Sequence, residues 1–319
     1  MNIIETHALS RVYGKRCAVD SLDMCVAAGE IYGFVGKNGA GKSTAMKMIA
    51  GLVRPTSGSV ELFGAQRRAR EGFSRVGALI EDPGILPTFS ALENLMCKAL
   101  ALGVVRPNAH CRELLELVGL ADTGSLRVKK FSLGMKQRLG LALALVGGPD
   151  LLLLDEPFNG LDPESTRAMR GALVRLNRER GVTMVISSHV LDQLDRMATS
   201  FGVIRSGRMV RELSMDDLHR ECGNSIRIRT NDPARTLAIL EEALPGTALR
   251  AEPDGSILAS AAVRHAATSF GGAAVAPMAP SAGDVARALS EHGLLILELS
   301  HVERDIEEYF VELMGGADA

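Results

Sequence analysis

The chain has 319 residues, of which 46% are hydrophobic and 23% charged, and its formal net charge is -2. This composition excludes extensive disorder and, without any block of consecutive basic residues, does not favour nucleic acid or anionic lipid as a partner. Five cysteines without a CxxC pair indicate neither a disulfide framework nor a zinc site, and the sequence shows neither a signal-like start nor a membrane-spanning apolar run, so we expect a cytosolic protein.

The first fifth of the chain alternates short strand-like runs with turns, and an apolar strand at 31–35 then enters a glycine-rich loop. Helical spacing replaces this pattern from about Ser90 to Val146. Within it Leu114, Leu117 and Val118 share one face, and Gly119 follows as a helix end. We therefore predict a helical subdomain at about 90–146.

Alternating elements follow: a strand at 151–154, a helix at 164–179, a strand at 182–187 and a helix from 190. Such alternation predicts a buried parallel sheet. After an interruption near 213–224, a second set predicts a separate small α/β domain, with a strand at 226–229, a helix at 233–243, a strand pair around Ala248 and Ile257, a helix at 283–292 and a strand at 294–299. We expect a long loop at 259–282 and domains at 1–220 and 221–319.

The glycine-rich loop, Gly-Lys-Asn-Gly-Ala-Gly-Lys-Ser at 36–43, fits the phosphate-loop pattern G-x-x-x-x-G-K-[ST] between a strand and a helix. Backbone amides of such a loop surround phosphates, while Lys42 reaches the β- and γ-phosphates and the Ser43 hydroxyl binds Mg²⁺. An ordinary glycine-rich turn is the alternative. We expect the ATP-binding residues of this segment to be Gly36, Asn38, Gly39, Ala40, Gly41, Lys42, Ser43 and Thr44.

A second motif ends the apolar strand at 151–154 with two carboxylates, Asp155 and Glu156, followed by Pro157. A parallel sheet places its ligands at this edge. Asp155 is predicted to hold Mg²⁺ and Glu156 to polarise the attacking water, because phosphoryl transfer needs both charge neutralisation and an oriented nucleophile. A strand followed by an acidic turn is the alternative for this motif alone.

Between the two motifs, Phe-Ser-Leu-Gly-Met-Lys-Gln-Arg at 131–138 resembles the Leu-Ser-Gly-Gly-Gln signature of the ATP-binding-cassette family. Ser132 is predicted to be the N-cap of a helix running through Leu145. The resemblance implies that Ser132 and Gly134 contact the γ-phosphate held by the opposite subunit. Phe131, Leu133 and Met135 depart from the family pattern.

Three further residues resemble family elements. Tyr13 is similar to the aromatic residue that stacks on adenine, the alternative being a half-buried strand tyrosine. His189, at the end of the strand at 182–187, is similar to the switch histidine at the γ-phosphate, which makes it catalytic with Lys42 and Glu156. Asp162 is similar to the residue that signals between subunits, and it is also a candidate N-cap.

Glu81 occupies the place where most relatives have a glutamine that binds Mg²⁺ and faces the membrane partner. This substitution and the forms of the motifs at 131–138 and 158–162 resemble the branch that includes bacitracin-resistance and lantibiotic-immunity transporters. About 220 residues carry the resemblance strongly.

The resemblance implies a P-loop NTPase core of the ABC ATPase type, with an N-terminal antiparallel β subdomain, a helical subdomain and a small C-terminal α/β domain. It also implies an ATP- and Mg²⁺-dependent ATPase that forms a homodimer and docks on separate transmembrane permease subunits at the inner face of the membrane. Export of an antimicrobial peptide or similar amphipathic compound is the function expected. A soluble cassette ATPase acting on ribosomes or DNA is the alternative.

Overall fold

The computed structural model describes residues 1–66, 75–222, 225–245, 247–261, 281–302 and 306–315. The chain forms two compact units, Met1–Glu212 and Leu213–Ala319. The division therefore falls before the boundary at residue 220 that the sequence pattern suggests.

An antiparallel sheet opens the first unit, in the strand order β2-β1-β4-β5. Ile4 and Leu9 of β1 are both fully buried. They are five residues apart, so alternation alone would place them on opposite faces, and the register shift between Thr6 and Leu9 turns both inward. The expected N-terminal antiparallel subdomain is confirmed, and its strands are β1 (Asn2–Tyr13), β2 (Arg16–Ala27), β4 (Ser57–Leu62) and β5 (Ala65–Gln66).

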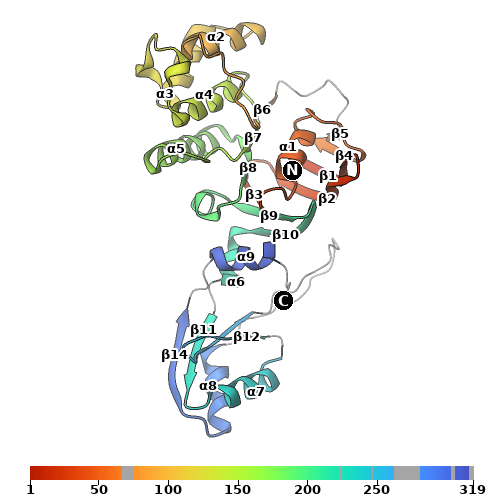
Figure 1. Ribbon diagram of the computed structural model, residues 1–319, viewed down its shortest axis with the longest axis vertical. Helices are drawn as coiled ribbons and strands as arrows, with labels where there is room; N and C mark the ends of the chain where they lie inside the picture. The colour runs from red at the N-terminus through yellow and green to blue at the C-terminus, as the bar shows by residue number, and fades with distance from the viewer. Residues whose placement is uncertain (67–74, 223–224, 246, 262–280, 303–305, 316–319) are drawn as a thin grey trace. The chain divides into compact units, whose positions relative to one another are not determined.

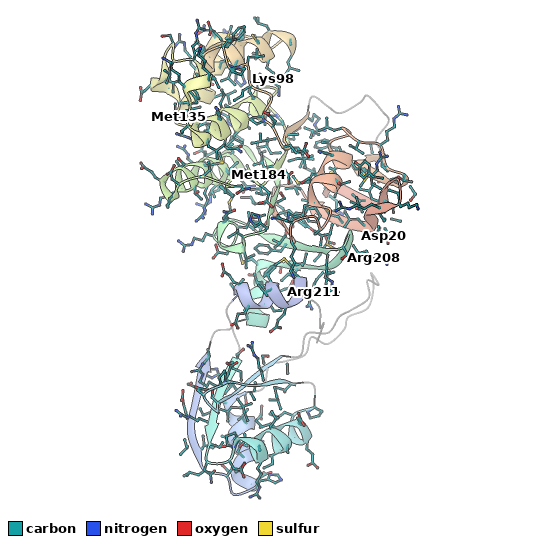
Figure 2. The ribbon with its side chains drawn as sticks, viewed as in Figure 1. Asp20, Lys98, Met135, Met184, Arg208 and Arg211 are labelled. Carbon is teal, nitrogen blue, oxygen red and sulfur yellow. The ribbon has the colours of Figure 1, made fainter. Side chains whose placement is uncertain are left out.

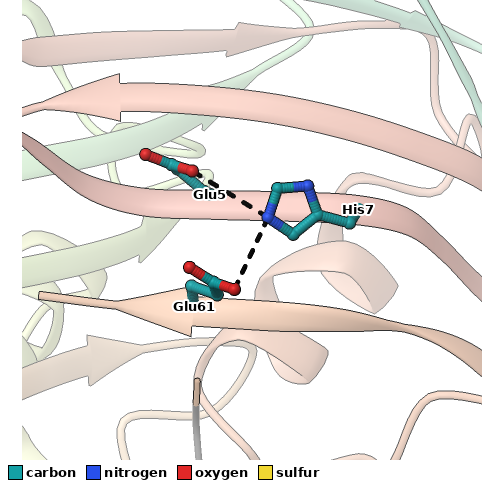
Figure 3. A group of neighbouring side chains, drawn as sticks. All are labelled: Glu5, His7 and Glu61. Carbon is teal, nitrogen blue, oxygen red and sulfur yellow. Dashed lines mark ion pairs between the residues drawn. The ribbon is translucent and has the colours of Figure 1, made fainter. Parts of the chain in front are cut away.

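The exposed face of this sheet carries two glutamates directly opposite each other, Glu5 on β1 and Glu61 on β4. Like charges in this position destabilise a strand pair. Nε2 of His7 lies 3.9 Å from Glu5 Oε2 and 3.8 Å from Glu61 Oε1, so the imidazole faces both carboxylates (Figure 3). Within the described part of the chain, these three residues are the one group of His, Cys, Asp or Glu side chains close enough to share an ion.

A six-stranded sheet forms the centre of the unit, in the order β10-β9-β3-β8-β7-β6. Its pairs β3–β8, β3–β9, β7–β8 and β6–β7 are parallel, which confirms the predicted parallel sheet. The strands are β3 (Ile31–Val35), β6 (Val76–Leu79), β7 (Leu151–Asp155), β8 (Thr183–Ser188), β9 (Ser200–Arg205) and β10 (Arg208–Ser214).

Helix α1 (Lys42–Ile49) packs into the core that the two sheets share (Figure 1). Ala45, Met46, Met48 and Ile49 of the helix belong to one buried cluster with apolar residues of β1, β2 and β4 from the antiparallel sheet and of β3, β7 and β8 from the parallel one. Burial of this kind contributes roughly 1.5–3 kcal/mol for each large apolar side chain. The helix and the loop before it are therefore held in place from both sides.

The predicted helical subdomain consists of α2 (Ala91–Ala101), α3 (Pro107–Leu117) and α4 (Leu133–Leu145), which lie together in Figure 1. Helix α2 begins with a complete capping box, in which Ser90 and Glu93 each accept the other's backbone N–H. Ser132 caps α4 as predicted, its hydroxyl accepting the Met135 N–H at 3.2 Å. Helix α5 (Pro163–Arg180) follows β7. Among the described residues, no helix is both long and apolar enough to cross a membrane.

The prediction of a helix from residue 190 is wrong. Only a 3-10 turn, Leu191–Gln193, follows β8. The hydroxyl of Ser188 accepts the Val190 N–H at 3.0 Å and also bonds to the Val190 carbonyl at 2.8 Å. Such local side-chain bonds compete with the start of a regular helix.

The second unit contains a four-stranded antiparallel sheet in the order β12-β13-β11-β14. Helices α7 and α8 contribute with these strands to one buried core, which includes Ile226, Leu240, Val285 and Leu289. The predicted strands and helices are all present: β11 (Ser225–Thr230), α7 (Pro233–Ala243), β12 (Thr247–Ala251), β13 (Ile257–Ala261), α8 (Ala282–Glu291) and β14 (Ile296–Val302).

Two helices of this unit were not predicted, α6 (Met215–Cys222) and α9 (Ile306–Gly315). Helix α6 lies within the stretch 213–224, where the sequence pattern is interrupted, and it contacts α9. Their apolar faces are buried, with Leu218 and Phe310 fully covered. The loop expected at 259–282 lies largely outside the described residues, and its first three residues belong to β13.

Candidate active site

The glycine-rich loop leaves the end of β3 and enters α1, as the sequence predicts. A Cβ atom on Gly41 would lie 2.5 Å from the Ala18 carbonyl oxygen, and its φ of +113° lies in the region that favours glycine. A Cβ atom on Gly36 would approach the Ile204 carbonyl oxygen equally closely. The motif glycines therefore let the loop pass between β2 and β9.

Lys42, the first residue of α1, points back into this loop. Its Nζ donates to the Gly36 carbonyl at 2.6 Å, and only 6% of the side chain is exposed. The same Nζ lies 3.3 Å from Glu156 Oε1. A buried ammonium group held beside this loop can neutralise an anion bound there.

Glu156 follows the end of β7 and lies between Lys42 and His189. Its Oε2 is 2.7 Å from His189 Nδ1, and the Glu156 side chain is 20% exposed. The residue has a φ of +48°, which is unfavourable for a residue other than glycine and is typical of strained positions at functional sites. The structure thus brings together the three residues that the sequence marks as catalytic.

Ser187, near the end of β8, links the carboxylate of Asp155 to the backbone of Glu156. Its hydroxyl donates to Asp155 Oδ1 at 2.6 Å and accepts the Glu156 backbone N–H at 2.9 Å. Ser187 is fully buried, so both bonds are shielded from water. This serine orients Asp155 and stabilises the strained backbone of Glu156.

A pocket of about 410 Å³ opens beside these groups. Tyr13 stands at its edge with 43% of its surface exposed. The pocket is lined by Tyr13, Arg16, Ala18, Asn38, Gly39, Gly41, Lys42, Ser43, Thr44 and Glu156. An aromatic ring, a loop of backbone amides, a buried lysine and a carboxylate together suit a nucleotide with its phosphates on the loop.

Contacts from β2 and from the turn between β9 and β10 fix the loop from outside the pocket. Gly207 donates its backbone N–H to the Ala40 carbonyl at 2.8 Å, and Asp20 donates its own to Gly207 at 2.9 Å. Arg208 then pairs with Asp20, Nη2 to Oδ2 at 2.6 Å, and the two side chains lie side by side in Figure 2. Strand β2, the β9–β10 turn and the loop are thereby joined.

The signature-like segment lies elsewhere: neither Ser132 nor Gly134 is among the described residues that line the pocket. Asp162 caps α5 as predicted, accepting the Ser165 N–H at 2.9 Å. This backbone hydrogen bond, together with one from the Ser165 hydroxyl, lowers the pKa of Asp162. The carboxylate therefore stays ionised at neutral pH.

Glu81 is also absent from the residues that line the pocket. It follows β6 with a φ of +61°, and its carboxylate lies 2.5 Å from Nζ of Lys47 on α1. Sequence reasoning missed both Lys47 and Ser187. Ser187 stands within the segment Ser-Ser-His that pointed to His189, but nothing in the sequence indicates which of the two serines reaches Asp155.

Comparisons with known proteins agree with this geometry. The sequence profile of the ABC transporter family matches residues 19–159. The bacitracin transport ATP-binding protein BcrA of Bacillus licheniformis is 36% identical over 316 residues, covering 98% of each chain. The lantibiotic transport ATP-binding protein SrtF of Streptococcus pyogenes is 38% identical over 214 residues, which are 67% of this chain and 92% of that protein.

Solved structures are similar in fold. An ATP-binding cassette bound to ADP and Pi superimposes with a TM-score of 0.61 at 22% identity, covering 66% of this chain and 98% of the other. The ATP-binding subunit of an ABC transporter gives the same TM-score at 29% identity, covering 68% of this chain and 92% of the other. The predicted fold class, an ABC-type P-loop core, is confirmed.

Proposed function

Because this chain belongs to the ABC transporter family, as one of its ATP-hydrolysing subunits, we propose that it powers export of an antimicrobial peptide or a similar amphipathic compound. The observation that carries the proposal is the similarity to a bacitracin transport protein over 98% of this chain, which includes the second unit. Relatives named for transport do not favour the alternative of a cassette ATPase acting on ribosomes or DNA.

In the proposed reaction, the loop amides and Lys42 hold the phosphates, and Glu156 orients the attacking water. The contact between His189 and Glu156 supports a shared role at the γ-phosphate. Ser43 and Asp155 offer oxygen ligands, the type that Mg²⁺ prefers, and a bound ion would neutralise charge on the phosphates. Ser187 supports this role, because it holds Oδ1 of Asp155 in one orientation.

The proposed active form is a homodimer. One chain carries a single phosphate loop and a single signature-like segment, and Ser132 and Gly134 do not line the pocket of their own chain in the part that the structure describes. A second copy would bring its signature segment to the phosphate, with Asp162 relaying the state of one site to the other. ATP would close this dimer and hydrolysis would open it.

Separate transmembrane permease subunits complete the proposed transporter, and the chain works at the inner face of the membrane by docking on them. Glu81 is the proposed link, because its carboxylate is largely exposed and is held by a lysine of the phosphate-loop helix. A movement of α1 on nucleotide binding would reach the docking surface through this pair. Direct binding of Mg²⁺ by Glu81 is the other role proposed for it.

The test is peptide resistance in the host cell. Cells carrying wild-type chain, no chain or the Glu156→Gln variant are grown in bacitracin, in a lantibiotic and in an unrelated small antibiotic, with equal protein levels checked by immunoblot. We expect the strain without the chain and the Glu156→Gln strain to lose resistance to bacitracin or to the lantibiotic. Their resistance to the small antibiotic should stay unchanged. Equal sensitivity of all three strains to every peptide would contradict peptide export. Co-purification with a multi-span membrane protein, rather than with ribosomes or DNA, tests the partner.

A further inference from the structure

Tyr13 does not stand alone at the edge of the nucleotide pocket. Arg11 precedes it by two residues in β1, so both side chains lie on the same side of the strand. The guanidinium carbon of Arg11 lies 4.5 Å from the centroid of the Tyr13 ring. A cation at this distance over an aromatic ring is attracted by the negative charge of the ring face.

Arg11 is itself held by a second contact. Its Nη1 donates to the backbone carbonyl of Arg54 at 2.9 Å, and Arg54 lies in the segment that connects α1 to β4. The neighbouring backbone is tied to the same segment, because Val12 donates its N–H to Thr56 Oγ1 at 3.0 Å and Thr56 donates its own to Ser10 at 2.8 Å. Arg11 thus connects the Tyr13 ring to the chain that leaves the phosphate-loop helix.

We propose that Arg11 is a positioning residue for adenine: it holds the Tyr13 ring in the orientation in which the base stacks on it. The proposal rests on the proposed function, in which Tyr13 contacts the base. A ring that is 43% exposed would otherwise lose conformational freedom on binding the nucleotide, and this loss weakens affinity. The Arg11 guanidinium, which is fixed by the Arg54 carbonyl, restricts the Tyr13 ring before the nucleotide binds. The phosphates bind at the loop and Lys42, so their binding does not depend on the orientation of the Tyr13 ring.

The proposal therefore makes the contribution of Arg11 specific to the base. Dissociation constants are measured for ADP, which carries the base, and for inorganic pyrophosphate, which does not, by calorimetry on the full chain. The variants are Arg11→Gln, Tyr13→Ala and, as a matched control, Lys15→Gln, which removes an exposed cation from the turn after Tyr13. Circular dichroism and melting temperature verify that each variant is folded.

We expect Arg11→Gln to weaken ADP binding about two- to fivefold, the effect of one cation–π contact at a partly exposed site, and to leave pyrophosphate binding unchanged. Lys15→Gln should change neither constant. Arg11→Lys should recover only part of the ADP affinity, because an ammonium keeps the charge but not the planar fork that both stacks and bonds to Arg54.

Three results would overturn the inference in distinguishable ways. Equal weakening of ADP and pyrophosphate would make Arg11 a source of general positive charge or of stability. Unchanged ADP binding in Arg11→Gln, with weakened binding in Tyr13→Ala, would leave the stacking role of Tyr13 intact and remove the role of Arg11. Unchanged ADP binding in Tyr13→Ala would instead refute the base contact in the proposed function, and the inference with it.

Discussion

Oε2 of Glu156 lies 2.7 Å from Nδ1 of His189, although the two residues are separated by 33 positions in the chain. One residue follows the end of β7 and the other the end of β8, and these strands are parallel neighbours in the sheet. The carboxyl ends of parallel strands meet at one edge, so the sheet itself brings the two side chains together. Substitutions of this pair and of the residues around it test the proposed catalytic roles.

Glu156→Gln should keep ATP binding and lower kcat by about 100- to 10,000-fold, because the amide preserves the shape but cannot act as the base. A steady-state phosphate-release assay measures the rate, and size-exclusion chromatography with MgATP should show a dimer that wild-type protein forms only transiently. Retained turnover would remove Glu156 from the mechanism. A variant that binds ATP but stays monomeric even with its membrane partner would count against the nucleotide sandwich.

Lys42→Ala should weaken nucleotide binding itself. The lost contact is a hydrogen bond to a charged group, worth about 1.5–3 kcal/mol, so the dissociation constant for ATP should rise about 10- to 100-fold. Inorganic tripolyphosphate should lose affinity to the same extent, since Lys42 is expected to contact phosphate and not the base. Unchanged affinity for both ligands would contradict the role given to Lys42.

Ser187→Ala should impair both stability and turnover. The Glu156 N–H would lose its buried acceptor, which costs about 1–3 kcal/mol of the free energy of unfolding. With Asp155 no longer oriented, we expect kcat to fall while the affinity for pyrophosphate stays constant. Thr183→Val is the matched control: it removes a buried hydroxyl that accepts the Gly29 backbone N–H at the other end of β8. Equal kcat values for the two variants would reject the orienting role of Ser187.

Glu81 variants separate coupling from metal binding. If Glu81 transmits motion to the permease, Glu81→Ala should keep most of the ATPase activity and lose peptide resistance, whereas a metal-ligand role would lower both together. Glu81→Gln tests the charge alone, because the amide has nearly the same volume. Lys47→Gln should reproduce the coupling defect with little loss of stability, since an exposed pair contributes only about 0.2–1 kcal/mol. Wild-type behaviour of all three variants in both assays would end the coupling hypothesis.

The capping box of α2 should make the free energy of unfolding depend on pH in the acidic range. Hydrogen bonds from the Ser90 backbone and side chain lower the pKa of Glu93, with a smaller contribution from Arg127. A lowered pKa means that this contribution is present above the ordinary glutamate pKa of about 4.3 and is lost as the pH falls through the lower value of the folded state. The melting temperatures of wild type and Glu93→Gln should therefore differ at pH 7 and converge once the pH falls below the lowered pKa of Glu93. A constant difference would contradict this account.

Much of the site was predictable from sequence because its motifs are local. The loop at 36–43, the strand ending in Asp155 and Glu156, and the caps at Ser132 and Asp162 each depend on a few consecutive residues whose backbone chemistry is specific. The same locality explains why the strand and helix positions of the parallel sheet were largely correct.

The tertiary structure decided the contacts between segments that are far apart in the chain. The pairing of Lys47 with Glu81, the bonds of Ser187 to Asp155 and Glu156, and the bond of Arg11 to the Arg54 carbonyl depend on how the strands, helix α1 and the segment after it pack together. The missing helix after Val190 has a local cause, since the Ser188 hydroxyl bonds to the Val190 backbone two residues along the chain. A sequence pattern records which residues favour a helix or a strand, whereas the distance between two side chains follows from packing, and packing is a property of the whole fold.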